Sequence, residues 1–333
     1  MAGTFYQGNT PDTTSKDLLT GDLLVKTTKQ EIDSKVFEHS IFNIFTRNIL
    51  DTGIQWEEIE VGNLTSDDFD ATGANPLTKK NMDLASIYHK INRRKTFKAT
   101  VSDAQIKMSM LSPEKMAVLS IAIVNEIYNS SAIEDFEAMK TLLSDIASQN
   151  KVINIVDLNG NGENPDAFTK AIQTLATNMG MPSTNYNFSA FKKAFSAKED
   201  LVLIIDSPTR AILNVDSLAS AFNMEKKDLV SNIIVIDEMP TIEYSAEKAD
   251  SVKTIDIGEG TDITVYRPNS SGAGTVTGKV KAFLADRRAI IRDPVERELE
   301  SERNAKGRFT NYYYHVTDVL SYSTLKNAVA LVD

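Results

Sequence analysis

Residues 112–148 read SPEKMAVLSIAIVNEIYNSSAIEDFEAMKTLLSDIAS, and this stretch decides how the chain is organised. Ser112 suits the N-cap of a helix and Pro113 its first position, because the first turn leaves backbone N–H groups without partners inside the helix. The positions expected along one face of the helix are apolar, namely Met116, Leu119, Ile123, Ile127, Phe136, Met139, Leu143 and Ile146. At 1.5 Å per residue, an unbroken helix would be about 50 Å long. We expect any kink at YNSSAI, residues 128–133.

Two segments lie upstream of this helix and have no core of their own. Residues 1 to about 35 are rich in Thr, Asp, Gly and Gln, a composition typical of an extended arm. The next segment, VFEHSIFNIFTRNILDTG at 36–53, has Phe37, Ile41, Ile44, Phe45 and Ile49 at three- and four-residue spacing. This spacing predicts a short amphipathic helix, which Gly53 would end.

A long hairpin is predicted between residues 55 and 101. Two alternating segments, IQWEEIEV at 54–61 and KINRRKTFKATV at 90–101, flank the polar stretch GNLTSDDFDATGANPLTKKNMD. Acidic residues in the hairpin precede a basic run, the two sets being Asp67, Asp68 and Asp70, and then Lys79, Lys80, His89, Lys90, Arg93, Arg94 and Lys95. The hairpin is either simply solvated or an arm whose two signs of charge meet neighbouring copies.

An α/β region follows the long helix. Asn164 and Pro165 begin a helix that Gly180 ends, and LVLIID at 201–206 and NIIVID at 232–237 are predicted as buried strands. VDSLASAFN at 215–223 is predicted as a short helix between these strands, and RPNSSGAGTVTG at 267–278 as a loop. VKAFLAD, AIIRD and the Tyr- and Val-rich closing segment from residue 309 predict further strands.

The composition excludes several classes of function. The chain has 333 residues, no cysteine and a formal net charge of −10. Disulfides and thiolate chemistry are thereby excluded, and contact with nucleic acid is expected to be loose because phosphate binding needs clustered Lys and Arg. We also expect no secretion signal and no membrane anchor, since no stretch approaches the roughly 18 apolar residues of a membrane span.

Residues 157–168, DLNGNGENPDAF, resemble the start of a calcium-binding loop. Asp157, Asn159 and Asn161 stand at alternate positions and Gly162 is sixth, as in an EF-hand. The twelfth position, which should be a bidentate Glu, is Phe168. We therefore interpret the segment as a turn that leads into the next helix, and we predict no metal site.

No catalytic or cofactor-binding constellation is predicted, so we expect a protein that is not an enzyme. SGAGTVTGKV at 271–280 fails the phosphate-loop pattern at both ends, and the aspartates that end the two buried strands, Asp206 and Asp237, are interpreted as structural. The three histidines, His39, His89 and His315, have no neighbouring nucleophile signature. A nucleotide-binding α/β enzyme built on these strands is the remote alternative.

The order arm, short helix, long hairpin, long helix, α/β region and closing strands resembles that of the major capsid protein of tailed bacteriophages. Two segments are similar to parts of such major head proteins, namely LVLIIDSPTRAILNVDSLASAFNMEKKDLVSNIIVIDEMP at 201–240 and RFTNYYYHVTDVLSYSTLKNAVALVD at 308–333. The resemblance implies an α+β fold of the Hong Kong 97 type. It divides the chain into an N-terminal arm at 1–54, an extended loop at 55–101, a peripheral domain at 102–151 and 308–333, and an axial domain at 152–307.

The resemblance also implies a structural function. Copies would assemble as hexamers and pentamers into the icosahedral shell around the double-stranded DNA of a tailed phage, in the host cytoplasm, and would remain in the virion capsid. The implied partners are a separate scaffolding protein, a portal and decoration proteins, with packaged DNA held by loose contacts. An encapsulin compartment, which encloses an enzyme instead of a genome, is the alternative on the same fold.

Overall fold

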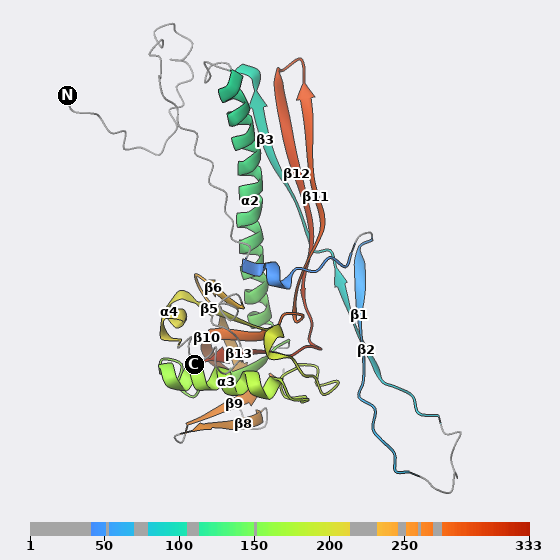
Figure 1. Cartoon of the computed structure of the whole chain (residues 1–333), viewed down its shortest axis with the longest axis vertical. Coiled ribbons are helices and arrows are strands. Elements are labelled where there is room, and N and C mark those ends of the chain that lie inside the picture. Colours follow the sequence, from blue (N-terminus) through green and yellow to red (C-terminus); the bar gives the residue numbers. More distant parts are fainter. Residues whose placement is uncertain are drawn as a thin grey trace, which may run out of the picture. The chain divides into compact units, whose positions relative to one another are not determined.

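The computed structural model (Figure 1) describes residues 41–50, 53–69, 79–104, 113–149, 152–213, 232–245, 251–258, 261–268 and 275–333. The chain divides into two units. Unit 1 comprises Met1–Phe37, Thr96–Ser131 and Leu299–Tyr314, and unit 2 comprises Glu38–Lys95, Ala132–Glu298 and His315–Asp333. No helix within the described residues is long and apolar enough to cross a membrane.

Five helices lie within the described part of the chain. They are η1 (Ile41–Phe45), α2 (Pro113–Ser148), α3 (Pro165–Met179), η2 (Lys198–Asp200) and α4 (Ser207–Ile212), of which the two marked η are 3₁₀-helices. The strands are β1 (Gln55–Val61), β2 (Leu84–Lys90), β3 (Arg93–Ser102), β4 (Asn154–Asp157), β5 (Leu201–Asp206), β6 (Ile233–Ile236), β7 (Thr241–Ser245), β8 (Ser251–Gly258), β9 (Thr261–Tyr266), β10 (Thr275–Asp286), β11 (Ile290–Asn304), β12 (Phe309–Tyr322) and β13 (Ala328–Val332).

An eight-stranded mixed sheet forms the centre of unit 2. Its strand order is β6-β5-β10-β13-β4-β9-β8, and β7 pairs with the first part of β10. Every residue of β5 is buried, as the continuous apolar run LVLIID predicts for a strand covered on both faces. Phe168 and Leu175 of α3, Phe283 of β10 and Met139 of α2 are among the side chains buried in the same core. The sheet is thus stabilised by apolar burial.

Helix α3 begins and ends where the sequence predicts. The Asn164 side chain accepts hydrogen bonds from the backbone N–H groups of Asp166 and Ala167, and Pro165 occupies the first turn, where its missing N–H costs nothing. The apolar face of α3 is buried, from Phe168 to Met179. These local signals were sufficient because capping and periodicity agree with the tertiary packing.

Helix α2 is continuous through residues 128–133, where a kink was expected. Helix propensities of Ser and Asn are only about half a kcal/mol poorer than that of Ala per residue. That cost is small beside the burial of Met139, Leu143 and Ile146 farther along the same helix. Ser112 lies outside the described residues, so its predicted capping role stays a prediction.

In unit 1 the described parts of β3, β11 and β12 carry polar and aromatic pairs. The Tyr128 and Tyr314 rings meet edge to face with their centroids 4.9 Å apart. Arg303 Nη2 lies 2.8 Å from Asp103 Oδ2, and Thr100 Oγ1 donates to Asn311 Oδ1 at 2.7 Å. The sheet order β11-β12-β3 explains the pair of Thr100 with Asn311, because β3 and β12 are neighbouring strands. Tyr128 instead reaches Tyr314 from α2.

The predicted strand pairing of the long hairpin was wrong. Strand β1 pairs with β2, residues 84–90, over seven residue pairs from Gln55↔Lys90 to Val61↔Leu84. The segment KINRRKTFKATV instead supplies β3, which joins the separate sheet beside β12. Both segments alternate in polarity, and alternation indicates a strand without indicating which strand lies beside it.

Two further local predictions differ from the structure. Within 36–53, the described residues contain only the five-residue η1, after which Arg47 N donates to the Arg292 carbonyl at 2.8 Å and the chain runs beside β11. The Asp293 carboxylate accepts from the backbone N–H groups of Ile49 and Leu50, which holds this part extended. Within the predicted loop at 267–278, residues 275–278 belong to β10. The predicted arm at 1–35 and helix at 215–223 lie outside the described residues.

Candidate functional site: the β1–β2 hairpin and its attachment

The β1–β2 hairpin turns one face toward the rest of unit 2. Successive side chains of a strand point to opposite faces, so Trp56, Glu58 and Glu60 share this face. Trp56 pairs with His89 across the hairpin, and their ring centroids lie 4.3 Å apart. His89 is buried, with Nδ1 2.8 Å from Ser321 Oγ and Nε2 3.3 Å from Glu58 Oε2. Polar side chains therefore form much of this attachment.

Two lysines from distant parts of the sequence complete the attachment. Lys326, between β12 and β13, contacts the Glu60 carboxylate, and its Nζ lies 3.3 Å from Glu58 Oε1. Lys192, from the segment between α3 and β5, contacts the other carboxylate oxygen of Glu60. The backbone N–H of Lys193 also donates to Asn63 Oδ1 at 2.6 Å. The paired part of the hairpin is thus joined to two separate loops of unit 2.

The electrostatic environment stabilises both glutamates in their charged form. Burial alone would raise the pKa of Glu58, but hydrogen bonds from His89 and Ser323 and the charge of Lys326 outweigh burial and hold this pKa at about 2. Burial opposes ionisation of Glu60 too, and its two lysine partners outweigh it and lower its pKa. The attachment therefore depends on carboxylates that are ionised at neutral pH.

The opposite face of the hairpin is exposed and carries four apolar or aromatic side chains among the polar residues Gln55, Glu57, Ser86 and Lys90. Ile59, Val61, Leu84 and Tyr88 occupy it, with Ile59 59% and Leu84 66% exposed, and Val61 pairs directly with Leu84. A two-stranded hairpin gains little stability by itself. Contiguous exposed apolar residues on a soluble protein mark interaction surfaces. We call these four side chains the outer face of the hairpin.

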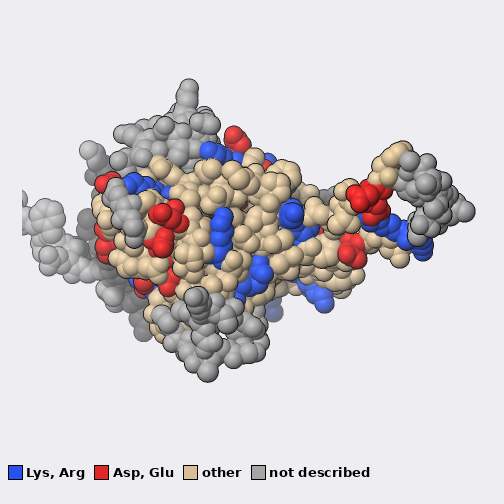
Figure 2. All heavy atoms as spheres, turned by 90° about the horizontal axis from the view of Figure 1, so that it is seen from below, with Lys and Arg blue, Asp and Glu red and all other residues tan. Residues whose placement is uncertain are grey.

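The end of the hairpin is held together internally and projects into solvent. Gly62 N donates to the Asp83 carbonyl at 2.8 Å, and farther out Lys80 Nζ lies 2.8 Å from Asp67 Oδ1. Phe69 is 94% exposed, the largest fraction among the exposed apolar side chains of the described residues. Figure 2 shows that acidic and basic residues lie close together near the end of the hairpin. Part of the two-signed charge in the sequence is therefore paired within the chain.

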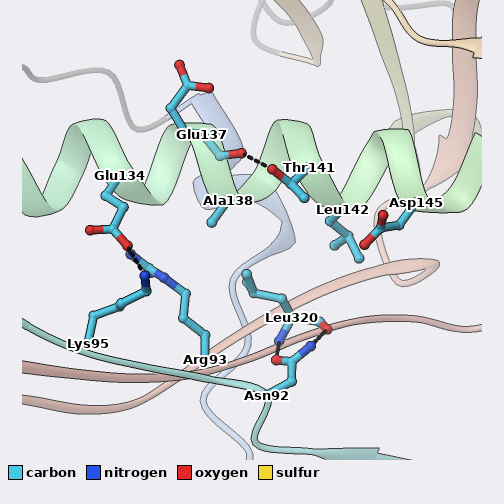
Figure 3. A pocket seen from close by; sticks show the side chains of 10 residues that line it. All are labelled: Asn92, Arg93, Lys95, Glu134, Glu137, Ala138, Thr141, Leu142, Asp145 and Leu320. Carbon is cyan, nitrogen blue, oxygen red and sulfur yellow. Dashed lines mark hydrogen bonds and ion pairs between the residues drawn. The ribbon is translucent and has the colours of Figure 1, made fainter.

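A second cluster of charges lies where β3 leaves the hairpin, and Figure 3 shows the Arg93 side chain extending from β3 toward α2. Arg93 contacts Asp135 of α2 and donates to Asp318 of β12 at 2.6 Å, and Arg297 of β11 lies 2.5 Å from the same Asp318. Arg292 joins through Asp135 at 2.7 Å. Asp318 is fully buried, so its negative charge needs cationic partners to offset the cost of burial. This cluster ties four elements of unit 2 together.

The chain is similar to known phage capsid proteins along most of its length. The family model described as "Phi29-like phage major capsid protein" matches residues 8–332. The chain belongs to this capsid-protein family. One relative is the major capsid protein of Bacillus phage GA-1, which is 29% identical over 297 residues that cover 87% of this chain and 55% of the relative. Another is the major capsid protein of Bacillus phage B103, which is 27% identical over 250 residues that cover 74% of this chain and 48% of the relative. The chain thus spans about half the length of these relatives.

Solved capsid structures share the fold of this family member. A chain in the capsid structure of Staphylococcus phage Andhra superposes with a TM-score of 0.65 at 13% identity, covering 92% of this chain and 89% of the other. A chain in the capsid of Ralstonia phage GP4 gives a TM-score of 0.54 at 8% identity, covering 92% and 95%. The mixed α and β architecture is therefore a phage capsid fold, and it is preserved at low sequence identity.

In this capsid-family chain, the calcium-like segment forms a turn. Asp157 accepts hydrogen bonds from Asn159 N at 2.8 Å and from the Tyr244 hydroxyl at 3.0 Å. The side-chain amides of Asn159 and Asn161 donate to backbone carbonyls, and Gly162 N donates to Asp333 Oδ1 at 3.0 Å. These bonds support the interpretation as a turn. Among the described residues, no group of three or more His, Asp or Glu side chains could hold a metal ion.

The other singled-out residues also have structural partners. Asp206 caps α4 by accepting from Thr209 N at 2.9 Å, and Asp237 lies 2.9 Å from Lys140 Nζ. Gly278 lies in β10, where a Cβ would meet the Val332 side chain at 2.0 Å, so close packing requires glycine there. His39 lies outside the described residues, and His315 lies in β12.

The sequence singled out neither Lys192 nor Lys326 for the hairpin. Lys192 is 132 residues from Glu60, and Lys326 is 266 residues from it. The alternating glutamates of WEEIE were the available signal, since a strand with Glu58 and Glu60 on its buried face requires cationic partners. That signal predicts the chemistry of the partners and not their positions.

Proposed function

We propose that copies of this chain assemble into the icosahedral shell of a tailed phage, as pentamers and hexamers with a Hong Kong 97-type fold, and that this shell encloses double-stranded DNA. The family match over residues 8–332 carries the proposal, because the relatives are named major capsid proteins. It also favours a phage capsid over an encapsulin compartment. The protein would function as a structural component of the virion and not as an enzyme, after assembly in the host cytoplasm.

The hairpin supplies the physical argument for self-assembly. Its inner face is held to its own unit by Glu58, Glu60, Lys192 and Lys326, while the outer face is apolar and exposed. An attachment of this kind fixes the direction of a surface whose apolar side chains stay exposed within its own chain. Another copy of the chain would bury that surface, and repetition of a weak contact over many copies would stabilise a closed shell.

The parts of the chain would then have distinct roles in the shell. Residues 1–54 would form an arm, 55–101 the extended loop, 102–151 with 308–333 the peripheral domain, and 152–307 the axial domain around the five-fold and quasi-six-fold axes. The net charge of −10 would keep packaged DNA from binding tightly to the shell. A scaffolding protein, a portal and decoration proteins are the expected partners during and after assembly.

Particle formation tests the proposed function directly. The protein would be expressed alone and together with a scaffolding protein encoded beside it, and particles would be measured by negative-stain electron microscopy. Closed shells or regular tubes are the expected result, and their diameter would separate a phage head from a smaller encapsulin. A stable monomer under both conditions would overturn the proposal.

A shortened hairpin tests whether the hairpin mediates assembly. Residues 63–82 would be replaced by Asn-Gly, a turn suited to a two-residue hairpin connection, so that Gly62 still reaches Asp83 and the base stays attached. We expect a folded protein, with the fluorescence of Trp56 unchanged because this side chain is the only tryptophan and lies at the hairpin base. Shells of normal size and yield from this variant would contradict the role of the hairpin.

A further inference from the structure

The turn between β4 and α3 contains two Asn-Gly steps in succession. In the first step, Asn159 and Gly160 both have positive φ angles, 51° and 79°, and Asn161 N donates to the Leu158 carbonyl at 3.1 Å. This is the pattern of a type I′ turn, which favours Asn followed by Gly because both residues tolerate a left-handed backbone. Turn geometry therefore accounts for the first step. The second step, Asn161–Gly162, follows directly and provides a reference within the same loop.

An Asn-Gly step is chemically reactive. The backbone nitrogen of the residue after an asparagine attacks the side-chain carbonyl carbon, and glycine hinders this attack least because it has no Cβ. The product is a cyclic succinimide, so the rate depends on whether the nitrogen is free and whether the backbone can rotate to bring the two atoms together. The surroundings of the two glycine nitrogens therefore decide which step reacts.

The first step is open to this reaction. Asn159 and Gly160 are both exposed, and a Cβ on Gly160 would meet no atom within 4 Å. Among the described residues, no group accepts a hydrogen bond from Gly160 N. The attack requires Asn159 to rotate out of the turn, which breaks the bond from Asn161 N and the exposed bond from Asn159 Nδ2 to the Asp262 carbonyl. An exposed turn held by so few bonds opens at small cost, and Gly160 N is then available.

The second step is held closed. Gly162 is buried, and its N–H donates to Asp333 Oδ1 at 3.0 Å. A Cβ on Gly162 would lie 2.7 Å from Asp333 Cγ, so this carboxylate packs directly against the backbone. The Asn161 side chain is also held, since its Nδ2 donates to the Leu158 carbonyl at 2.8 Å. Attack by Gly162 N requires the loss of a hydrogen bond to a charged group, which slows the reaction by roughly tenfold or more.

We propose that Asn159 is a site of spontaneous deamidation and that Asp333 protects Asn161 from the same reaction. Gly160 N forms a bond to Asn159 Cγ, the C–N bond of the side-chain amide breaks, and the proton from Gly160 N leaves with the side-chain nitrogen as ammonia. Water then opens the succinimide at one of its two carbonyl carbons, which gives aspartate or isoaspartate. Water is the only other reactant, and the inference does not depend on the proposed assembly.

Deamidation would change the contacts of the turn with the β8–β9 pair. Asn159 Nδ2 donates to the Asp262 carbonyl in β9 at 2.6 Å, and Asn159 N donates to Asp157 Oδ1 at 2.8 Å. A carboxylate at position 159 has no N–H for the Asp262 carbonyl, and the charge of Asp157 repels it. Isoaspartate also lengthens the backbone of the turn. The modification therefore loosens the attachment of β9 to this turn and adds one negative charge to each copy of the chain.

Peptide mapping of the folded full-length protein tests the proposal. The protein would be incubated in mildly alkaline buffer, and samples taken over time would be digested with trypsin and measured by mass spectrometry. The tryptic peptide 152–170 contains both Asn-Gly steps, with Asn154 and Asn164 as references that are not followed by glycine. We expect a mass gain of one dalton that fragment ions place on Asn159, with conversion at Asn161 roughly tenfold slower or more. Equal conversion at the two sites, or none at Asn159, would overturn the proposal.

Two comparisons separate the effect of the structure from that of the sequence. In urea, where Gly162 N no longer contacts Asp333, both Asn-Gly steps should react at similar rates. In the folded variant Asp333→Ala, conversion at Asn161 should rise roughly tenfold, while conversion at Asn159 stays unchanged. Asp67→Ala is the control, because it removes the same charge from the exposed hairpin and should alter neither rate. An unchanged rate at Asn161 in Asp333→Ala would contradict the protection by Asp333.

Discussion

The eight-stranded sheet and the β1–β2 hairpin belong to the same unit but are stabilised in opposite ways. In the sheet, apolar side chains such as Ile204 and Phe283 are buried in one hydrophobic core. In the hairpin, Glu58 and Glu60 face the protein, whereas Ile59 and Leu84 face solvent. The sheet is therefore stabilised by apolar contacts within one chain. The hairpin is held in place by ion pairs and leaves its apolar side chains exposed.

The largest expected effect on stability comes from the core of the sheet. Phe283→Ala removes a side chain that is 1% exposed in β10, between β5 and β13, and leaves a cavity. We expect a loss of about 3–5 kcal/mol in the free energy of unfolding. Urea denaturation followed by far-UV circular dichroism would measure it. A loss below about 1 kcal/mol would mean that the sheet is not the main source of stability in unit 2.

The next effect concerns the charge cluster beside the hairpin. Asp318→Asn removes a buried carboxylate that Arg93 and Arg297 share, and leaves two guanidinium groups with one partner fewer. We expect a loss of about 3 kcal/mol in the same denaturation experiment. Asp103→Asn is the matched control, because its pair with Arg303 is largely exposed and should contribute far less to the free energy of unfolding. Equal losses from the two variants would contradict the importance of burial.

Acid should release the hairpin base before it unfolds the sheet. Glu58 has a folded pKa of about 2 against an ordinary value of 4.5. Its contribution to the free energy of unfolding is therefore complete above the ordinary pKa and is lost as the pH falls from about 4.5 toward 2. The loss amounts to about 2 kcal/mol by pH 3. Trp56 fluorescence, which reports on the hairpin base, should change at higher pH than the circular dichroism of the sheet.

Glu58→Gln is the control for this acid response. The variant should start with a weaker base at pH 7, because Lys326 loses one of its two carboxylate partners. Between pH 4.5 and 2 its Trp56 signal should change less than that of the wild type. Identical acid titrations of the two proteins would show that other carboxylates control the attachment.

The smallest effect on stability is expected at the outer face of the hairpin. Substitutions there should change assembly far more than they change stability. Ile59→Thr with Leu84→Thr keeps a favourable strand residue at one exposed position and introduces one at the other. We expect the free energy of unfolding to change by less than about 0.5 kcal/mol. Particle yield, measured by sedimentation, should nevertheless fall strongly. Normal yield would mean that this surface is not buried between copies.

Local sequence signals predicted much of the sheet region and less of the hairpin. Asn164 and Pro165 marked the start of α3, and the run LVLIID marked a strand buried on both faces, since in both places one side-chain pattern has one structural solution. The partner of β1 was predicted wrongly because alternating segments at 84–90 and 93–102 are equally compatible with a strand. The partners of Glu60 could not be predicted at all, because Lys192 and Lys326 are 132 and 266 residues away from it.

The sequence by itself determined the composition-level facts and the local ones: no cysteine chemistry, a long amphipathic helix, capped α3, buried strands, and a polar hairpin with two signs of charge. Tertiary structure decided which strand pairs with β1, which lysines hold Glu58 and Glu60, and which face of the hairpin is left exposed. The physical reason is the sequence separation over which the two kinds of interaction act. Capping and periodicity act over a few residues, whereas strand pairing and ion pairs join residues hundreds of positions apart, and a single sequence carries no record of which distant groups will meet.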